Sequence, residues 1–214
     1  MKIAARTTPI ALLALALLAI PPAAASAEPA RGRGADSAQA LEPRAAAVQE
    51  ALLRLPYYGV FDFLTFAYDK GTVTLGGYVY QVGLKAAAER AVKRVPGVDE
   101  VKNTIQELSL STGDDNLRWQ VFYAIYTNDF LSRYAPEWGT PWGRRAMLRF
   151  SGRFAGFPGT QPIGNFPIHI IVDRGRVRLL GVVDNEADKS VAGLAARGVP
   201  GSFSVDNELV VATS

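Results

Sequence analysis

Arginine and aromatic residues gather in one segment, residues 136–165, and this mixture is the strongest chemical signal in the sequence. The segment reads PEWGTPWGRRAMLRFSGRFAGFPGTQPIGN and carries four arginines against one acid, Glu137. Guanidinium groups bind phosphates, and aromatic rings favour the boundary between lipid headgroups and acyl chains. The segment therefore predicts a reversible contact with an anionic phospholipid surface.

The residues expected to make that contact are of two kinds. The aromatic members are Trp138, Trp142, Phe150, Phe154 and Phe157, and the basic members are Arg144, Arg145, Arg149 and Arg153. About 1 kcal/mol from each arginine and from each of two half-buried rings gives about 6 kcal/mol, which is reversible binding rather than anchoring. The alternative is an ordered flap whose rings pack on Trp119 and Tyr126 while its arginines are only solvated.

A second aromatic group falls on a predicted helix at residues 115–134, DNLRWQVFYAIYTNDFLSRY. At 100° per residue, one side of this helix carries aliphatic residues and the other side is aromatic. The aromatic face consists of Trp119, Phe122, Tyr126 and Phe130. A helix that is apolar on two sides must be covered twice. The aromatic face is covered either by the first half of the chain or by the segment at 136–165, which we call the insertion. Alternatively, this face is an exposed surface that binds lipid or a partner.

The sequence offers little for catalysis or metal binding. The one histidine, His169, alternates with apolar residues in a predicted strand, and nothing identifies a nucleophile or an acid beside it. There is no cysteine, and Asp114 and Asp115 are better placed to cap the following helix than to hold a metal. No glycine loop of the phosphate-binding type occurs. We therefore predict a protein that is not an enzyme and has no metal or cofactor.

The N-terminal residues predict export. Lys2 and Arg6 precede an apolar run at residues 10–20, and Ala25-Ser26-Ala27 provides small residues for cleavage, so we expect a secretory signal at 1–27. An uncleaved amphipathic anchor is the alternative. Residues 28–40 are predicted to be a flexible leader. No later run is long enough to span a bilayer, so the mature chain is expected in the periplasm.

Net charge argues against a nucleic-acid partner. Removal of Lys2 and Arg6 leaves 21 basic residues against 20 acidic ones, so the net charge falls from +3 to +1. Nucleic-acid binding by a whole domain usually needs a clearly basic surface. The basic and aromatic insertion resembles a single-strand groove in composition, but an exported chain seldom meets such a ligand.

The helices and strands that must position the insertion occur twice along the chain. Shifting the sequence by 104 residues superposes 71–106 on 175–210 with 13 of 36 positions identical, where composition alone gives about two. In the first copy, hydrophobic spacing predicts a helix at 41–55, strands at 63–68 and 72–79, a helix at 84–95 and a strand at 98–108. The prediction is an α+β fold of two αββαβ modules, at 41–110 and 114–214. Each has a three-stranded sheet packed with two helices, and the second carries the insertion.

Four glycines are predicted to serve this architecture rather than chemistry. They are Gly77, Gly97, Gly181 and Gly201. Gly77 and Gly181 interrupt apolar strand faces, and we expect the missing side chain to let helix and sheet backbones approach closely. Gly97 and Gly201 follow a proline at a helix end and can adopt the positive φ of such an exit.

The pattern Gly-x-Val-x-Leu-x-Gly at 71–77, followed by Ala88 and Ala91 in a helix and by Val95-Pro96-Gly97-Val98, resembles the BON domain of bacterial envelope proteins. The second copy keeps most of this pattern, although Ser202 stands in place of Val98. The resemblance implies an envelope binding module, with phospholipid association, osmotic-stress protection and chaperone-like support of outer-membrane proteins as family themes.

Three functions remain open from the sequence. The first is association with anionic phospholipid through the insertion and the aromatic helix. The second is binding of another envelope protein through a sheet edge or the aromatic helix face. The third is a structural spacer in which the two modules dock rigidly, with Trp119 and Tyr126 buried against the first module.

Overall fold

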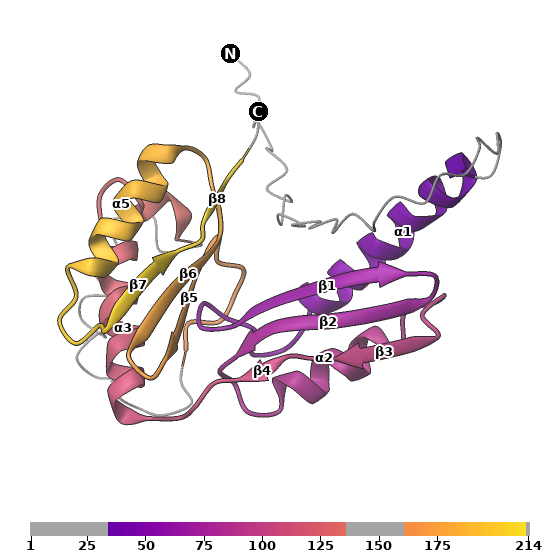
Figure 1. Ribbon diagram of the computed structural model, residues 1–214, viewed down its shortest axis with the longest axis horizontal. Helices are drawn as coiled ribbons and strands as arrows, with labels where there is room; N and C mark the ends of the chain where they lie inside the picture. The colour runs from indigo at the N-terminus through magenta and orange to yellow at the C-terminus, as the bar shows by residue number, and fades with distance from the viewer. Residues whose placement is uncertain (1–33, 136–160, 213–214) are drawn as a thin grey trace, which may run out of the picture.

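The computed structural model describes residues 34–135 and 161–212, which form two α+β modules in succession (Figure 1). The first module contains α1 (Gly34–Leu53), β1 (Phe63–Asp69), β2 (Thr72–Val79), α2 (Leu84–Val92), β3 (Glu100–Asn103) and β4 (Gln106–Glu107). The second contains α3 (Thr112–Tyr126), η1 (Ser132–Tyr134), β5 (Ile168–Asp173), β6 (Arg176–Val183), α5 (Glu186–Arg197), β7 (Ser204–Asn207) and β8 (Val210–Val211). The predicted α+β class and its two αββαβ modules are confirmed.

The two sheets share one topology and one register. In each module the first strand is antiparallel to the second, and the third is parallel to it, so the second strand lies in the centre. Phe66 pairs with Leu75 and Ile170 pairs with Leu179, which keeps the 104-residue offset in three dimensions. The predicted third strand is interrupted, and β4 and β8 continue it along the same central strands.

Helix α1 begins earlier than the sequence pattern indicates. It starts at Gly34, so residues 34–40 of the predicted flexible leader are helical. Three of these seven residues are alanine, the best helix former, and the stretch joins the amphipathic part of α1 directly, so the helix extends into it. Pro43 lies inside the helix and removes one backbone donor.

Helix α3 is shorter than predicted. It ends at Tyr126 instead of continuing to residue 134. The side chain of Thr127 donates to the carbonyl of Tyr123 at 2.6 Å, and the backbone N–H of Phe130 donates to Asn128 Oδ1 at 2.9 Å. Short polar side chains that bond the nearby backbone compete with helix continuation. The chain therefore turns after Tyr126, and Phe130 lies outside the helix.

The central strands contain a glycine whose role differs from the prediction. Gly77 has φ of 98° and Gly181 has φ of 125°. A Cβ atom at Gly77 would lie 2.0 Å from the carbonyl oxygen of Phe63, and one at Gly181 would lie 2.0 Å from that of Pro167. The close approach is thus between neighbouring strand backbones, not between helix and sheet. Gly97 and Gly201, at the helix exits, also have positive φ, at 84° and 93°.

The hydrophobic core is divided unequally between the modules. One cluster lies within the first module, between α1, α2 and the inner face of its sheet. The other fills the second module but also includes Val60, Phe61, Tyr80 and Leu108 of the first. Because Val60 and Phe61 are fully buried in that second cluster, the modules are docked on each other.

Candidate functional site

The predicted lipid-contact residues lie outside the described part of the chain. They are Trp138, Trp142, Arg144, Arg145, Arg149, Phe150, Arg153 and Phe154. The segments on either side are described, and they show where the insertion leaves and rejoins the fold. The candidate site is therefore built from these two anchors, which we call the start anchor and the end anchor.

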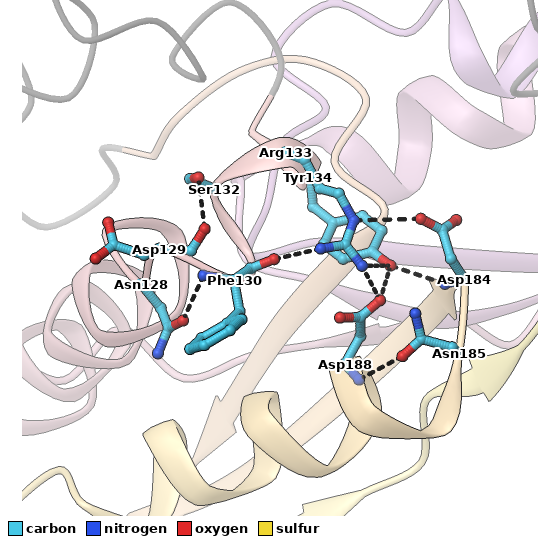
Figure 2. A network of polar contacts seen from close by, with 9 residues as sticks. All are labelled: Asn128, Asp129, Phe130, Ser132, Arg133, Tyr134, Asp184, Asn185 and Asp188. Carbon is cyan, nitrogen blue, oxygen red and sulfur yellow. Dashed lines mark hydrogen bonds and ion pairs between the residues drawn. The ribbon is translucent and has the colours of Figure 1, made fainter.

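The start anchor is a network of polar contacts around η1 (Figure 2). Arg133 forms ion pairs with Asp188 and with Asp184, the latter at 3.4 Å. The hydroxyl of Tyr134 donates to Asp188 Oδ2 at 2.7 Å and accepts from the backbone N–H of Asp184 at 2.8 Å. Asn185 caps α5 by accepting from the N–H of Asp188 at 2.9 Å. The chain is thereby fixed to the β6–α5 connection immediately before the insertion.

The end anchor joins the insertion to the first module. Gln161 accepts from the N–H of Phe61 at 3.0 Å and donates to the carbonyl of Tyr57 at 2.9 Å and to the Asp62 carboxylate. Beside it, residues 162–164 pair with residues 58–60 in the manner of antiparallel strands. The insertion therefore begins on the second module and ends on the first.

Asp62 organises the end anchor from inside the protein. Its buried carboxylate accepts hydrogen bonds from the N–H groups of Gly59 at 3.1 Å, Tyr80 at 2.7 Å and Gln81 at 3.3 Å. Burial raises the pKa of Asp62, and the hydrogen bonds from Gln161 and the backbone oppose that rise. One side chain thus fixes the 59–62 turn, the end of β2 and the end of the insertion.

The aromatic helix face is an interior surface. Trp119, Phe122 and Tyr126 are at most 8% exposed. Phe61 of the first module meets the rings of Trp119 and Phe122 edge-on, at centroid distances of 5.6 and 6.3 Å. Phe166, just after the insertion, covers Phe122 and Tyr126. The covering predicted for this face thus comes from the first module and from Phe166, and these three rings offer no lipid or partner surface.

The two ends of this helix differ from the prediction. Phe130, assigned to the aromatic face, is 70% exposed and lies beyond the end of α3. The helix is capped by Ser111, whose hydroxyl accepts from the N–H of Asp114 at 3.1 Å. Asp114 and Asp115 occupy the first turn but direct their carboxylates to other partners: Asp114 to the β5–β6 turn and Asp115 to Arg118.

Arg118 is a buried cation that the sequence prediction missed. It forms an ion pair with Asp115, donates to the carbonyl of Val172 at 2.6 Å and lies over the Tyr80 ring at 4.4 Å. Tyr80 belongs to the first module, so this guanidinium group bridges the two modules. The three-residue spacing of Asp115 and Arg118 on a helix was the available signal. Its burial depends on the docking of the modules, which the spacing does not encode.

His169 also lies at this junction. Its ring is buried between those of Tyr58 and Phe63, at centroid distances of 5.6 and 5.3 Å. Burial lowers the pKa of His169 to about 4. Contacts with the backbone of Asp62 and Gly59 act in the opposite direction and raise the pKa by less. The histidine is therefore neutral and enclosed at neutral pH.

The low pKa of His169 predicts a loss of stability in mild acid. The unfolded chain binds a proton near pH 6.5 that the folded protein takes up only near pH 4, so this group's contribution is present above pH 6.5 and lost as pH falls. We expect the free energy of unfolding to drop by about 3 kcal/mol across this window. Urea titrations between pH 7 and 4 of the wild type and of His169→Asn measure it, and the variant should lack this component.

The comparison of the wild type with His169→Asn isolates the effect of histidine titration, because His169 is the only histidine in the sequence. The raised pKa of Asp62 acts in the opposite direction, since protonation favours the folded state there, but it is present in both proteins. Parallel pH profiles for the wild type and the variant would contradict the prediction.

Residues 34–135 and 161–212 offer no candidate cluster of metal ligands and no candidate membrane-spanning helix. No group of three or more histidine or acidic side chains in these ranges is arranged to hold a metal ion. In the same ranges, no helix combines the length and the apolar character needed to cross a membrane.

Comparison with known proteins finds similar solved structures at low sequence identity. None of the curated proteins matches the chain. Two solved structures from Chlamydia trachomatis are similar: CdsD, described as a structural protein of the Type III secretion system, and the C-terminal domain of CdsD. The first is 15% identical with a TM-score of 0.24, over 79% of this chain and 92% of that one. The second is 12% identical with a TM-score of 0.23, over 78% and 96%.

The family match agrees with the duplication seen in the sheets. The BON domain model matches residues 42–108 and 156–213, which together make up more than half of the 214 residues. One match falls on each module, and the second begins inside the insertion. The chain therefore belongs to the BON domain family, whose modules are typical of the bacterial envelope, and carries two tandem copies.

Proposed function

We propose that this protein is a non-enzymatic envelope binding protein that associates reversibly with anionic phospholipid surfaces through the insertion at 136–165. The observation that supports the proposal is that both ends of this cationic, aromatic segment are fixed on one docked body. Arg133 and Tyr134 fix its start, and Gln161 fixes its end. Restraining a loop at both ends lowers the entropy that it loses on binding.

The proposal includes the chain's cellular setting. Export to the periplasm, with cleavage of the signal near Ala27, would bring the mature protein to phospholipid surfaces of the envelope. A protective role in envelope or osmotic stress is the physiological part of the proposal. The mature modules would then span 41–110 and 114–214, with α1 reaching into the leader.

Co-sedimentation with vesicles of phosphatidylglycerol and phosphatidylcholine tests the lipid contact. Changing Arg144, Arg145, Arg149 and Arg153 together to serine removes the cations of the insertion. At about 1 kcal/mol for each cation near an anionic surface, binding should weaken at least about 100-fold. Wild-type binding should also fall steeply as salt is raised from about 0.05 to 0.5 M, because salt screens exposed charges.

The matched control removes four exposed cations from the first module, at Arg54, Arg90, Lys93 and Arg94. It changes the net charge equally and should weaken vesicle binding by no more than about threefold. The proposal would be rejected if vesicle binding were unchanged both by the four arginine substitutions in the insertion and by high salt. If vesicles give no signal and the protein instead captures another envelope protein, the protein-binding alternative is supported.

A further inference from the structure

The turn between β5 and β6 is held more firmly than a surface hairpin needs. The buried carboxylate of Asp114 accepts from the N–H of Arg174 at 3.0 Å and from that of Gly175 at 2.8 Å. Arg174 itself has a positive φ of 51°. The start of α3 thus clamps the turn, and its two flanking arginines, Arg174 and Arg176, remain exposed.

An exposed aromatic ring is fixed beside these arginines. The N–H of Phe203 donates to the carbonyl of Gly175 at 2.7 Å, so Phe203 is tied to the clamped turn. Its side chain is 81% exposed, more than any other large hydrophobic residue in the described ranges. Asp173, Arg174, Arg176 and Phe203 line one open hollow at the surface, and we call these four residues the cationic tip.

The first module provides an internal comparison for the cationic tip. The same backbone bond is present there, from the N–H of Asp99 to the carbonyl of Gly71 at 2.8 Å. By this bond and the 104-residue offset, Asp99 takes the place of Phe203, Lys70 that of Arg174 and Thr72 that of Arg176. The fold therefore does not require an exposed ring or a second cation at this position.

Charge separates the two turns as well. In the first module, Asp69, Lys70, Asp99 and Glu100 carry a formal charge of −2. The cationic tip carries +1, because Asp173 faces Arg176 across the hairpin. An exposed aromatic ring flanked by arginines is the composition of an interfacial membrane contact, where the ring enters the headgroup boundary and the cations meet phosphates.

We infer that the cationic tip is a second phospholipid contact, with Phe203 entering the headgroup region of an anionic surface while Arg174 and Arg176 bind its phosphates. The inference rests on the proposed function, since the ligand class is the same. An acidic peptide is less well suited, because the tip presents one ring in an open hollow rather than a groove along which a chain could lie.

Site-specific labelling tests the inference. Because the sequence contains no cysteine, a single introduced cysteine is the only thiol that reacts with the dye. Phe203→Cys and, as the matched control, Asp99→Cys are each labelled with the environment-sensitive dye NBD. On phosphatidylglycerol-containing vesicles, the dye at 203 should shift its emission to the blue and brighten, while the dye at 99 should stay unchanged. A dye at 203 that stays aqueous while the labelled protein sediments with vesicles would overturn the inference and leave the insertion proposal standing.

Substituting the arginines of the cationic tip measures how much they contribute to vesicle binding. Arg174→Ser with Arg176→Ser should weaken vesicle binding about tenfold, because two cations leave the surface. The control, Lys70→Ser with Lys102→Ser, removes two exposed cations from the first module and should change binding less than about twofold. Circular dichroism and urea midpoints establish that both variants are folded. Equal binding by both double variants would also overturn the inference.

Two further outcomes separate this inference from the proposed function. If loss of the insertion arginines leaves binding intact while the tip variant loses it, the tip alone binds lipid and the insertion proposal fails. If wild type does not bind vesicles at all, both fail. A dye at 203 that responds to polyglutamate but not to vesicles would assign the tip to an acidic peptide and reject the lipid surface.

Discussion

Replacing Arg118 with methionine should lower the free energy of unfolding by about 3 to 5 kcal/mol, because it leaves a buried carboxylate without its partner. Asp115 and Arg118 are both essentially inaccessible to solvent. The change also removes donors to the carbonyls of Val172 and Ser109 and the cation above the Tyr80 ring. Since Tyr80 belongs to the first module, the loss should appear in the unfolding of the whole docked body.

Urea unfolding followed by circular dichroism measures this effect. Arg54→Met is the matched control: Arg54 pairs with Glu50, but its side chain is 77% exposed, so the cost should stay under about 1 kcal/mol. Combining Arg118→Met with Asp115→Leu should recover much of the loss, since Asp115 Oδ2 and Arg118 Nε have no hydrogen-bond partner within the described ranges. A loss below about 1 kcal/mol for Arg118→Met alone would contradict the prediction.

The fold of each module could be predicted from the sequence because its signals are local or repeated. The alternation of Val73, Leu75 and Val79 in β2 and the three- and four-residue spacing in α2 reflect which side faces the core. Because the sequence repeats after 104 residues, the elements predicted for one module could be transferred to the other. The equivalent pairs Phe66–Leu75 and Ile170–Leu179 show that the two hairpins have the same register. The bounds of β1, β2 and α2 were therefore predicted to within a few residues, whereas α1 starts seven residues earlier and α3 ends eight residues earlier than its spacing predicts.

The docking of the modules could not be predicted in the same way. Residues 57–62 lie between a helix and a strand and show no period, yet Val60 and Phe61 are fully buried in the second module's core. The carbonyl of Val60 accepts from the N–H of Ile170 at 2.9 Å. Such contacts join residues far apart in sequence, and no local spacing identifies the partner.

The candidate site depends on the same long-range contacts. Asp62, Gln161 and Arg118 looked like ordinary surface residues in the sequence, but docking turns all three into buried or partly buried connectors. The aromatic face of α3 was recognised as needing a second cover, although the sequence left that cover open. Phe203 was missed because a single exposed ring in a turn has no pattern of its own, and only comparison with Asp99 distinguishes it.

Changing Gly77 or Gly181 to alanine should each cost about 3 to 5 kcal/mol of folding free energy, for a reason that side-chain repacking cannot relieve. The new Cβ atom would lie 2.0 Å from a backbone carbonyl oxygen of the paired strand segment, at Phe63 or at Pro167. In addition, φ values of 98° and 125° are strained for any residue with a side chain. The strands must separate locally, which breaks ladder hydrogen bonds.

Two other glycines separate the collision from the strain. Gly201 has φ of 93°, but a Cβ atom there would meet nothing within 4 Å, so Gly201→Ala should cost about 1 to 2 kcal/mol. Gly113 lies in α3 without a positive φ and also has open space, so Gly113→Ala should be neutral or stabilise by up to about 1 kcal/mol. Unfolding of all four variants in urea gives this order. If Gly77→Ala and Gly181→Ala lost no more than Gly201→Ala, backbone strain alone would explain them and the strand collision would be rejected.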